Sequence, residues 1–386
     1  MKPPSVSSAL KSSSSPKRVD DGWRLSTAPT PPASTAGLPQ SRFVALDGLR
    51  GIAALAVVLY HVQAPAGAMW LAPHGFLAVD FFFALSGFVI AHAYRMRLET
   101  GETSPAWFFV RRFARLWPSA MLGTAIGVAA VLLGRSELTP AETSSGRAIA
   151  LLAVLALAFA PRLGSSIAYP LNPPMWSLFD ELAANLIYAA GVYRLRVPAL
   201  AAATFAAAIA TTTALVLGVG GSTLLRALYP YFAGALIYEL RTAKVTAPPV
   251  PPLVAALAVV AAFFVPENSS RTIEVGFRAC FVLVACPLAV WSAAEMELPR
   301  AGDRIARAAG DASYPLYSIH YPALLIATAG APNSLSLAAA AGLVGLLAFA
   351  AVGVARYYDA PLRRVLLGPR RATLTALGRF KVRRHL

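Results

Sequence analysis

Residues 42–62 read RFVALDGLRGIAALAVVLYHV, an apolar stretch long enough to cross a membrane that nevertheless contains Asp47, Arg50 and His61. About 20 apolar residues in an α-helix span the hydrocarbon layer. Arg50 and His61 are 11 positions apart. That is about three helical turns, so they share one face, with Asp47 one turn before Arg50. Ionisable side chains inside a span usually mark reactive sites or solute pathways. The stretch therefore predicts a membrane helix with a functional polar face, unless these side chains only reach the headgroups at its ends.

The composition of the whole chain is typical of a membrane protein. Hydrophobic residues make up 57% of the 386 residues and charged residues only 13%, and the mean hydropathy is +0.59. Soluble globular domains are less apolar than this. The residues behind the formal net charge of +16 lie in short loops and tails between apolar stretches, which is the pattern of membrane topology. We therefore expect an all-α polytopic membrane protein that contacts membrane lipids and binds no nucleic acid.

Apolar stretches that are long enough to span, or nearly so, recur along the chain. There are 11 of them, at residues 43–63, 75–95, 117–134, 147–163, 174–193, 199–218, 224–240, 250–266, 272–294, 312–330 and 335–356. Basic segments mark the cytoplasmic side. Three stretches separate the basic segments at Arg115 and Arg194, an odd number that would place these segments on opposite sides. We therefore predict that 147–163 is re-entrant or interfacial, which leaves about ten transmembrane helices and both termini cytoplasmic.

The two ends of the chain differ from the region between them. Residues 1–41 are rich in Ser and Pro and lack a hydrophobic run, so they are predicted to be a disordered cytoplasmic tail without the apolar core of a cleavable signal peptide. Residues 367–386 are predicted to be a basic cytoplasmic tail held against anionic lipid. The region 42–366 is expected to form the functional transmembrane domain.

The second span contains a carboxylate. VDFFFALSGFVI, residues 79–90, includes Asp80. An unpaired carboxylate is unfavourable in lipid, so Asp80 is expected to face the first helix or a water-filled cavity. Gly87, beside Ser86, is expected to allow close helix packing.

The loop before the third span contains an arginine pair. RRFARLWP, residues 111–118, places Arg112 and Arg115 about one helical turn apart. Such a pair can hold phosphate groups through charge-assisted hydrogen bonds, and arginine is better suited to this role than lysine. An ordinary cytoplasmic anchor gives the same pattern.

Polar residues recur at helical spacing in NPPMWSLFDELAANLIY, residues 172–188. The stripe consists of Ser177, Glu181, Asn185 and Tyr188, with Asp180 beside Glu181. Buried carboxylates in this segment could orient His61 or bind a hydroxylated substrate. An ion pair with Arg50 is the alternative. Later in the chain, SYPLYSIHYP places His320 between tyrosines, and RYYDAPLRR contains Asp359.

These motifs together resemble a known family. In order they are LDGLRGIAALAVVLYH, VDFFFALSGFVI, RRFARLWP, WSLFDEL, SYPLYSIHYP and YYDAPLRR. The ordered series is similar to the membrane acyltransferase 3 family, the integral-membrane O-acyltransferases, over about residues 42–366. Each motif alone would be a weak signal, whereas the set is specific.

The resemblance implies an enzyme of the bacterial inner membrane with ten helices. It would take an acyl group, commonly acetyl from acetyl-CoA, and deliver it to a hydroxyl of a glycan or lipid-linked acceptor. By the same resemblance, His61 with Arg50 corresponds to the catalytic pair and Arg112 with Arg115 to residues linked to the CoA donor. The motif around Trp176, Ser177 and Glu181 departs from the family pattern at Asp180 and in Leu182-Ala183, and Asp359 stands where a glutamate is common.

The mechanism that we expect has His61 as a general base on the acceptor hydroxyl or as a transient carrier of the acyl group. Asp47, Arg50 and Glu181 would set its orientation and charge. Arg112 and Arg115 would bind the phosphates of acyl-CoA. Substrate contacts are expected from Asp80, Trp176, Ser177 and His320, and no metal site is expected.

Two other functions fit the same polar residues. A transporter or flippase for a glycan or lipid-linked solute could use buried charges to bind its cargo, but it predicts inverted internal repeats, which the sequence does not display. An inactive relative could serve as a binding partner, although the intact arginine and histidine series argues against it. Polysaccharide, peptidoglycan, glycolipid and small-molecule acceptors all stay open.

Overall fold

The structure, a computed structural model, describes residues 42–135, 145–163, 167–218, 223–329 and 331–368. Every regular element within these ranges is a helix. The N-terminal tail predicted at 1–41 and most of the basic tail predicted at 367–386 lie outside the described residues. The predictions for both tails therefore stay predictions.

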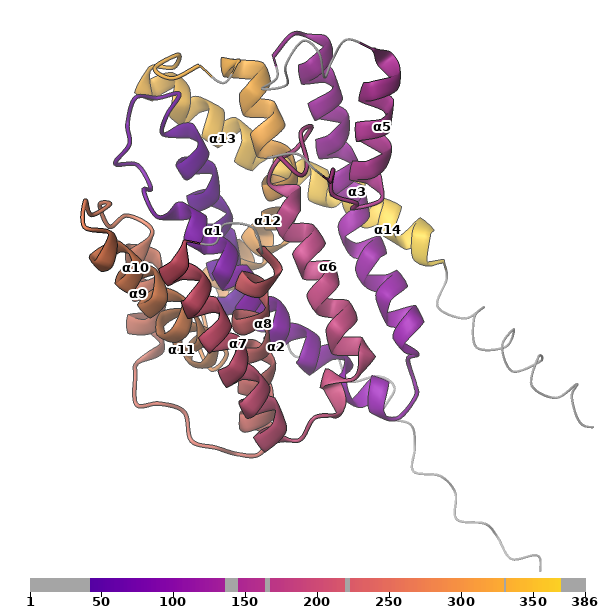
Figure 1. The fold of residues 1–386 in the computed structure, drawn as a ribbon, viewed down its shortest axis with the longest axis vertical. Coiled ribbons are helices and arrows are strands. Elements are labelled where there is room, and N and C mark those ends of the chain that lie inside the picture. The colour runs from indigo at the N-terminus through magenta and orange to yellow at the C-terminus, as the bar shows by residue number, and fades with distance from the viewer. Residues whose placement is uncertain (1–41, 136–144, 164–166, 219–222, 330, 369–386) are drawn as a thin grey trace, which may run out of the picture. The chain divides into compact units, whose positions relative to one another are not determined.

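The helices follow one another along the chain with short connections (Figure 1). The α-helices are α1 (Val44–Val62), α2 (Ala78–Glu99), α3 (Pro105–Leu132), α5 (Gly146–Leu157), α6 (Met175–Ala190), α7 (Val197–Leu217), α8 (Thr223–Thr242), α9 (Pro252–Ala262), α10 (Arg271–Cys280), α11 (Cys286–Ala293), α12 (Arg300–Thr328), α13 (Leu337–Gly353) and α14 (Ala360–Leu367). The 3-10 helices are η1 (Gly75–Leu77) and η2 (Val192–Arg194), and the π-helical segments are η3 (Phe281–Ala285) and η4 (Val354–Asp359).

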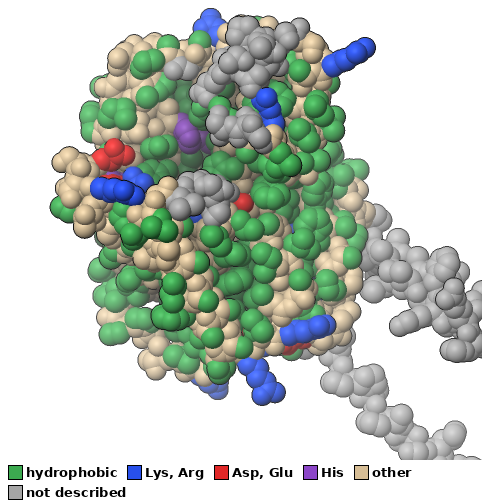
Figure 2. Space-filling model, viewed as in Figure 1, with side chains coloured by type: hydrophobic (Ala, Val, Ile, Leu, Met, Phe, Trp, Pro, Cys, Tyr) green, Lys and Arg blue, Asp and Glu red, His purple; other side chains and the backbone are tan. Residues whose placement is uncertain are grey.

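Six helical segments are long and apolar enough to cross a membrane. They are α1, Gly75–Glu99, α3, α7, Arg271–Ala293 and Leu337–Leu367. Hydrophobic side chains also cover much of the face seen in Figure 2. The expected all-helical membrane protein is confirmed for the described residues. Length and composition alone give six candidate spans and do not confirm the expected ten, because α6 and α9 are short and α8 and α12 contain charged and other polar residues.

Helix α5 is shorter than a full membrane span. Its 12 residues rise about 18 Å at 1.5 Å per residue, against a hydrocarbon layer of about 30 Å. The indole nitrogen of Trp117, near the middle of α3, donates a hydrogen bond of 3.0 Å to the carbonyl oxygen of Leu157 at the end of α5. Helix α5 thus lies along only part of α3 (Figure 1). Because α9 is as short, with 11 residues, helix length does not test the interpretation of 147–163 as an incomplete crossing, which stays a prediction.

Two helix pairs, α1 with α12 and α2 with α8, pack closely through small residues. A Cβ atom at Gly51 would lie 2.5 Å from Cβ of Ala309, and one at Gly87 would lie 1.9 Å from the carbonyl oxygen of Tyr231. No side chain fits at either position, so glycine is what allows the helices to approach each other. The predicted packing role of Gly87 is confirmed.

The last motif of the chain joins two helices. The π-helical segment η4 ends at Asp359, which is buried and accepts a hydrogen bond of 2.9 Å from the Ser119 hydroxyl on α3. Arg363 on α14 pairs with the same carboxylate at 2.8 Å. Asp359 therefore anchors the C-terminal helices to α3.

Candidate active site

Two cavities lie between the helices and share two wall residues, Val79 and Tyr317. The first, of about 170 Å³, has charged and hydroxyl side chains in its wall and is called the arginine cavity. Its polar lining residues are Arg50, Ser86, Arg112, Arg115, Ser177, Glu181, Ser313, Tyr314 and Tyr317. The second, of about 390 Å³, is called the histidine cavity. Its lining residues include Tyr60, His61, Phe76, Trp176, Arg226, Glu267 and Arg278.

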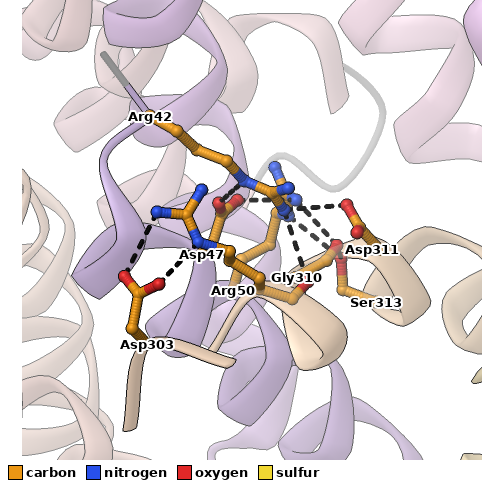
Figure 3. A network of polar contacts seen from close by, with 8 residues as sticks. Arg42, Asp47, Arg50, Asp303, Gly310, Asp311 and Ser313 are labelled. Carbon is orange, nitrogen blue, oxygen red and sulfur yellow. Dashed lines mark hydrogen bonds and ion pairs between the residues drawn. The ribbon is translucent and has the colours of Figure 1, made fainter. Parts of the chain in front are cut away.

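Arg50 is held by three acceptors (Figure 3). Its Nη2 donates to the carbonyl oxygen of Gly310 at 2.7 Å and pairs with Asp47 at 2.9 Å, and its Nε donates to the Ser313 hydroxyl at 3.0 Å. Gly310 and Ser313 belong to α12, so the guanidinium joins α1 to α12. This geometry does not fit an arginine that only reaches toward the headgroups.

Asp47 takes part in the same network. It pairs with Arg42 as well as with Arg50, and Arg42 also contacts Asp311 of α12 at 2.8 Å. Asp47 and Arg50 were expected to orient His61 directly, but their contacts lie at the opposite end of α1 from His61. The reason is helix length, because three turns separate the two positions. Both residues can affect His61 only through the pairing of α1 with α12.

His61 contacts a second histidine. Its Nδ1 lies 2.9 Å from the carbonyl oxygen of Val57 and 3.2 Å from Nε2 of His320 on α12. The two imidazole rings have centroids 5.0 Å apart. His61 lines the histidine cavity, whereas His320 is fully buried and is absent from the lining of both cavities. The expected substrate contact of His320 is therefore replaced by a contact with His61.

Glu181 belongs to the arginine cavity. One of its carboxylate oxygens accepts hydrogen bonds from Arg112 at 2.8 Å and from the Ser86 hydroxyl at 3.0 Å. Neither the expected contact with His61 nor the alternative ion pair with Arg50 occurs among the described residues. Glu181 lies on α6 facing α3 and α2, and the sequence did not determine which helix α6 would face.

The two arginines of α3 differ in their partners. Arg112 forms the ion pair with Glu181. Arg115 lines the same cavity, and within the described ranges it forms no ion pair. The two side chains, which were expected to act alike, thus differ in their environment: in the described part of the chain, Arg115 has no ion-paired carboxylate that a ligand would have to displace.

Asp80 is fully buried and binds an arginine that the sequence interpretation missed. Arg226 on α8 donates to both carboxylate oxygens of Asp80, at 2.8 and 2.5 Å. Asp80 was expected to face the first helix or a cavity, but it does not line either cavity and holds Arg226, which lines the histidine cavity. The rule that singled out Asp80 would also have found Arg226, an arginine inside an apolar stretch.

Tyr317 and the α6 motif form the wall between the cavities. The hydroxyls of Ser177 and Tyr317 are 2.7 Å apart, and that of Tyr317 donates to the carbonyl oxygen of Pro174 at 3.1 Å. Ser177 therefore belongs to this wall and also lines the arginine cavity. Trp176, the preceding residue, faces the histidine cavity with Arg226 over its indole ring at 5.7 Å. Adjacent positions on α6 thus serve different cavities.

The described ranges contain no cluster of side chains that could bind a metal ion. No group of three or more His, Cys, Asp or Glu side chains there is placed to hold an ion.

The sequence is similar to those of known acyltransferases. Residues 43–355 match a family described as an acyltransferase domain. Protein 2 in the picA locus of Rhizobium radiobacter is 40% identical over 163 residues, which cover 39% of this chain and 83% of that protein. The peptidoglycan O-acetyltransferase OatA of Listeria monocytogenes is 39% identical over 75 residues, 19% of this chain but only 11% of OatA. No solved structure matches the chain.

Proposed function

The chain belongs to the acyltransferase 3 family, and we propose that it is a membrane-bound O-acyltransferase that moves an acyl group, in the first place acetyl, from acyl-CoA to a hydroxyl of a cell-surface or exported carbohydrate. The observation that carries this proposal is the pair of cavities that share Val79 and Tyr317, one lined by arginines and the other by His61.

The arginine cavity suits the donor because its cations exceed its anions. Three arginines line it, and the carboxylates that form ion pairs with them are Glu181 and Asp47. CoA carries phosphate groups, and arginine binds phosphate with paired hydrogen bonds. Arg115 would bind a phosphate first, with Arg112 held beside it by Glu181. The acyl end would then point toward the shared wall.

The histidine cavity suits a hydroxylated acceptor without net charge. Arg226 and Arg278 line it, but Asp80, Glu274 and Glu267 lie beside them, so carboxylates outnumber arginines. Trp176 and Tyr60 offer aromatic faces, and such pockets with a few polar groups are typical of small-ligand sites. A sugar hydroxyl could approach His61 in this cavity.

In the proposed reaction His61 acts as a general base. It takes the proton of the acceptor hydroxyl while the hydroxyl oxygen attacks the acyl carbonyl carbon. The new ester C–O bond forms, the thioester C–S bond breaks, and the departing CoA thiolate takes the proton back from His61. The donor and acceptor cavities bring the two substrates together from opposite sides of the shared wall.

We further propose ten transmembrane helices in the bacterial inner membrane, namely the six candidate spans together with α6, α8, α9 and α12. Length does not separate α9, with 11 residues, from α5, with 12; the parity of the basic segments is what leaves α5 out. The arginine cavity would open to the cytoplasm and both termini would lie there. Single cysteines at Glu102, Ser145 and Arg196, in a Cys280→Ser background, test this arrangement. We expect Glu102 and Arg196 to be labelled from the same face and Ser145 from the other, whereas Ser145 on the face of Arg196 would make α5 a full crossing.

The function itself is tested by the chemistry of the cell surface. In a deletion strain, base-labile O-acetyl esters should disappear from one class of surface or exported glycan, and membranes of the wild type should transfer label from [1-¹⁴C]acetyl-CoA into base-labile material. The rival transporter or flippase predicts glycans with unchanged ester content but altered amount outside the cell. OatA is named for peptidoglycan, which makes peptidoglycan one of the fractions to measure.

A further inference from the structure

We infer that His320 is a positioning residue that fixes the tautomer of His61, so that the nitrogen of His61 facing the acceptor is the unprotonated one. The inference rests on the proposed function and deepens it. It begins from a buried imidazole that would otherwise have no role, since His320 is fully buried and the cavity linings do not include it.

The hydrogen bonds of His320 define its own tautomer. Its Nδ1 lies 2.7 Å from the carbonyl oxygen of Tyr317 and 3.2 Å from that of Leu316. A carbonyl oxygen can only accept, so Nδ1 must carry the proton. A neutral imidazole has one protonated nitrogen and one acceptor. The Nε2 atom of His320 is therefore an acceptor, and it points at His61.

The tautomer of His61 follows from this. Its Nδ1 faces two acceptors, the carbonyl oxygen of Val57 at 2.9 Å and Nε2 of His320 at 3.2 Å. Only a protonated Nδ1 satisfies both. The proton of neutral His61 is thus on Nδ1, and its Nε2 carries the free electron pair. Among the described residues Nε2 of His61 has no hydrogen-bond partner, and His61 lines the histidine cavity.

The same contacts support the charged form of His61 during the reaction. When Nε2 accepts the proton of the acceptor hydroxyl, Nδ1–H continues to donate to Val57 and His320. Many catalytic histidines use a carboxylate in this position. A neutral imidazole is a weaker partner, but it avoids the large desolvation penalty of a buried carboxylate.

The polar network at the other end of α1 keeps this contact in register. Arg50 binds Ser313 and Gly310 of α12, and Ser313 lies seven residues, about two turns, before His320 on the same face of that helix. A shift of α12 by one residue would move His320 by about 1.5 Å. A hydrogen bond of 3.2 Å does not survive such a shift.

Two amide variants separate the acceptor atom from the rest of the side chain. A glutamine side chain in place of His320 would put an oxygen near the position of the histidine Nε2, whereas an asparagine is one bond shorter and does not reach His61. We therefore compare His320→Gln with His320→Asn in the full-length protein in native membranes. Initial rates of label transfer from [1-¹⁴C]acetyl-CoA into base-labile material are measured against donor concentration at matched protein level. His92→Asn, at a histidine packed against Phe43 and Tyr238, is the control.

We expect His320→Asn to lower kcat by about 10- to 100-fold, which is part of the 10²- to 10⁴-fold that a general base contributes, with the donor KM unchanged within about twofold. His320→Gln should recover most of this loss, and His92→Asn should behave as the wild type. Equal rates in the Asn and Gln variants, whether both high or both low, would overturn the inference, and so would a loss that appears in KM alone. If His61→Ala retains activity, it is the proposed function of His61 that fails, whatever the His320 variants do.

Discussion

The two cavities of this protein hold different excesses of charge, although a wall one side chain thick separates them at Tyr317. At the arginine cavity, three arginines form ion pairs with only two carboxylates. Beside the histidine cavity, two arginines face three carboxylates. An anionic ligand is therefore favoured on one side only. Arginine inside a membrane domain does not by itself indicate an anion site. Whether the site favours an anion depends on how many carboxylates lie beside the arginines.

The cavities also differ in how their key side chains are held. The guanidinium of Arg226 is fixed by a fully buried carboxylate, Asp80, whereas within the described residues Arg115 has no ion pair. A fixed cation shapes a pocket, and a cation without a carboxylate can bind a ligand anion without breaking a pair first. We therefore expect Arg226 to fix the shape of the histidine cavity and Arg115 to bind the anionic donor in the arginine cavity.

The largest effect is expected at the histidine cavity. Replacing His61 by alanine should lower the rate of acyl transfer by at least about 100-fold, because proton transfer by a positioned side chain contributes about 10²- to 10⁴-fold. The measurement is label transfer from [1-¹⁴C]acetyl-CoA in membranes at matched protein level. The protein should still fold, with a loss of about 1 to 3 kcal/mol because Nε2 of the buried His320 loses its donor, and thermal stability in detergent checks this. His92→Ala is the control, and a normal rate in His61→Ala would remove the histidine cavity from catalysis.

A second large effect is expected where the arginine cavity meets the α1–α12 contact. Arg50→Lys should lower the rate about 10- to 100-fold, nearly as much as Arg50→Ala. A lysine carries the charge but cannot reach Gly310, Ser313 and Asp47 together, because it lacks the planar fork. A displacement of about 1 Å at a catalytic group can reduce a rate about 100-fold.

The control for this change is Arg97→Lys, at an arginine that pairs with Glu102 and lines neither cavity. It should leave the rate unchanged. Substantial activity in Arg50→Lys membranes would show that charge alone suffices at position 50, and Arg50 would then be a helix-entry residue rather than part of the active site.

Much of the fold could be predicted from the sequence because it depends on local properties. Apolar length predicted the helices, and the parity of basic loops predicted an incomplete crossing at 147–163, where α5 has 12 residues. The predicted count of ten is not confirmed, because helices such as α8 and α12 contain charged and other polar residues and are not apolar enough over 18 residues to qualify as spans by composition. Their burial depends on neighbours that are distant in the sequence.

The sequence singled out several side chains that lie at the two cavities or pair with their lining residues, but it did not predict which side chains would pair. The rule that ionisable residues in apolar spans are functional found Asp47, Arg50, His61 and Asp80. It could not predict that Asp80 would meet Arg226, 146 residues later, or that Glu181 would meet Arg112. Pairing follows from which helix faces which, and helical spacing within one segment contains no information about that.

An intermediate effect is expected at the arginine cavity. Arg115→Ala should raise the KM for acetyl-CoA about 10-fold with little change in kcat, because one phosphate contact of about 1.4 kcal/mol is lost. Arg112→Ala should raise the KM as well, but it also leaves Glu181 without its arginine, so it should lower thermal stability.

Two further variants sharpen this contrast. Adding Glu181→Gln to Arg112→Ala should restore the stability, since the unpaired carboxylate is removed. Arg111→Ala, on the same helix but stacked over Trp107 and outside the cavity lining, should change neither quantity. An unchanged donor KM in both Arg112→Ala and Arg115→Ala would reduce the pair to a topology anchor.

The smallest effect is expected in the wall itself. Tyr317→Phe removes the hydroxyl that contacts Ser177 and Pro174 but keeps the ring between the cavities. Ser177 still donates to the carbonyl oxygen of Pro174 at 3.1 Å, so no buried polar group loses its last partner. The loss should be about 1 kcal/mol in stability, the value of one hydrogen bond, and less than about fivefold in rate.

The matched variant Tyr317→Ala removes the ring and should join the two cavities. Water from the histidine cavity could then reach the acyl carbonyl, so hydrolysis of acetyl-CoA should become measurable in membranes from which the acceptor glycan has been removed, while Tyr317→Phe should hydrolyse no more than the wild type. The comparison of the cavities depends on this difference. If the alanine variant leaves hydrolysis at the wild-type level, the ring of Tyr317 is not the barrier between donor and acceptor, and the two cavities do not meet there. If the phenylalanine variant hydrolyses acetyl-CoA as fast as the alanine variant, the barrier is the hydroxyl contact with Ser177 and not the ring.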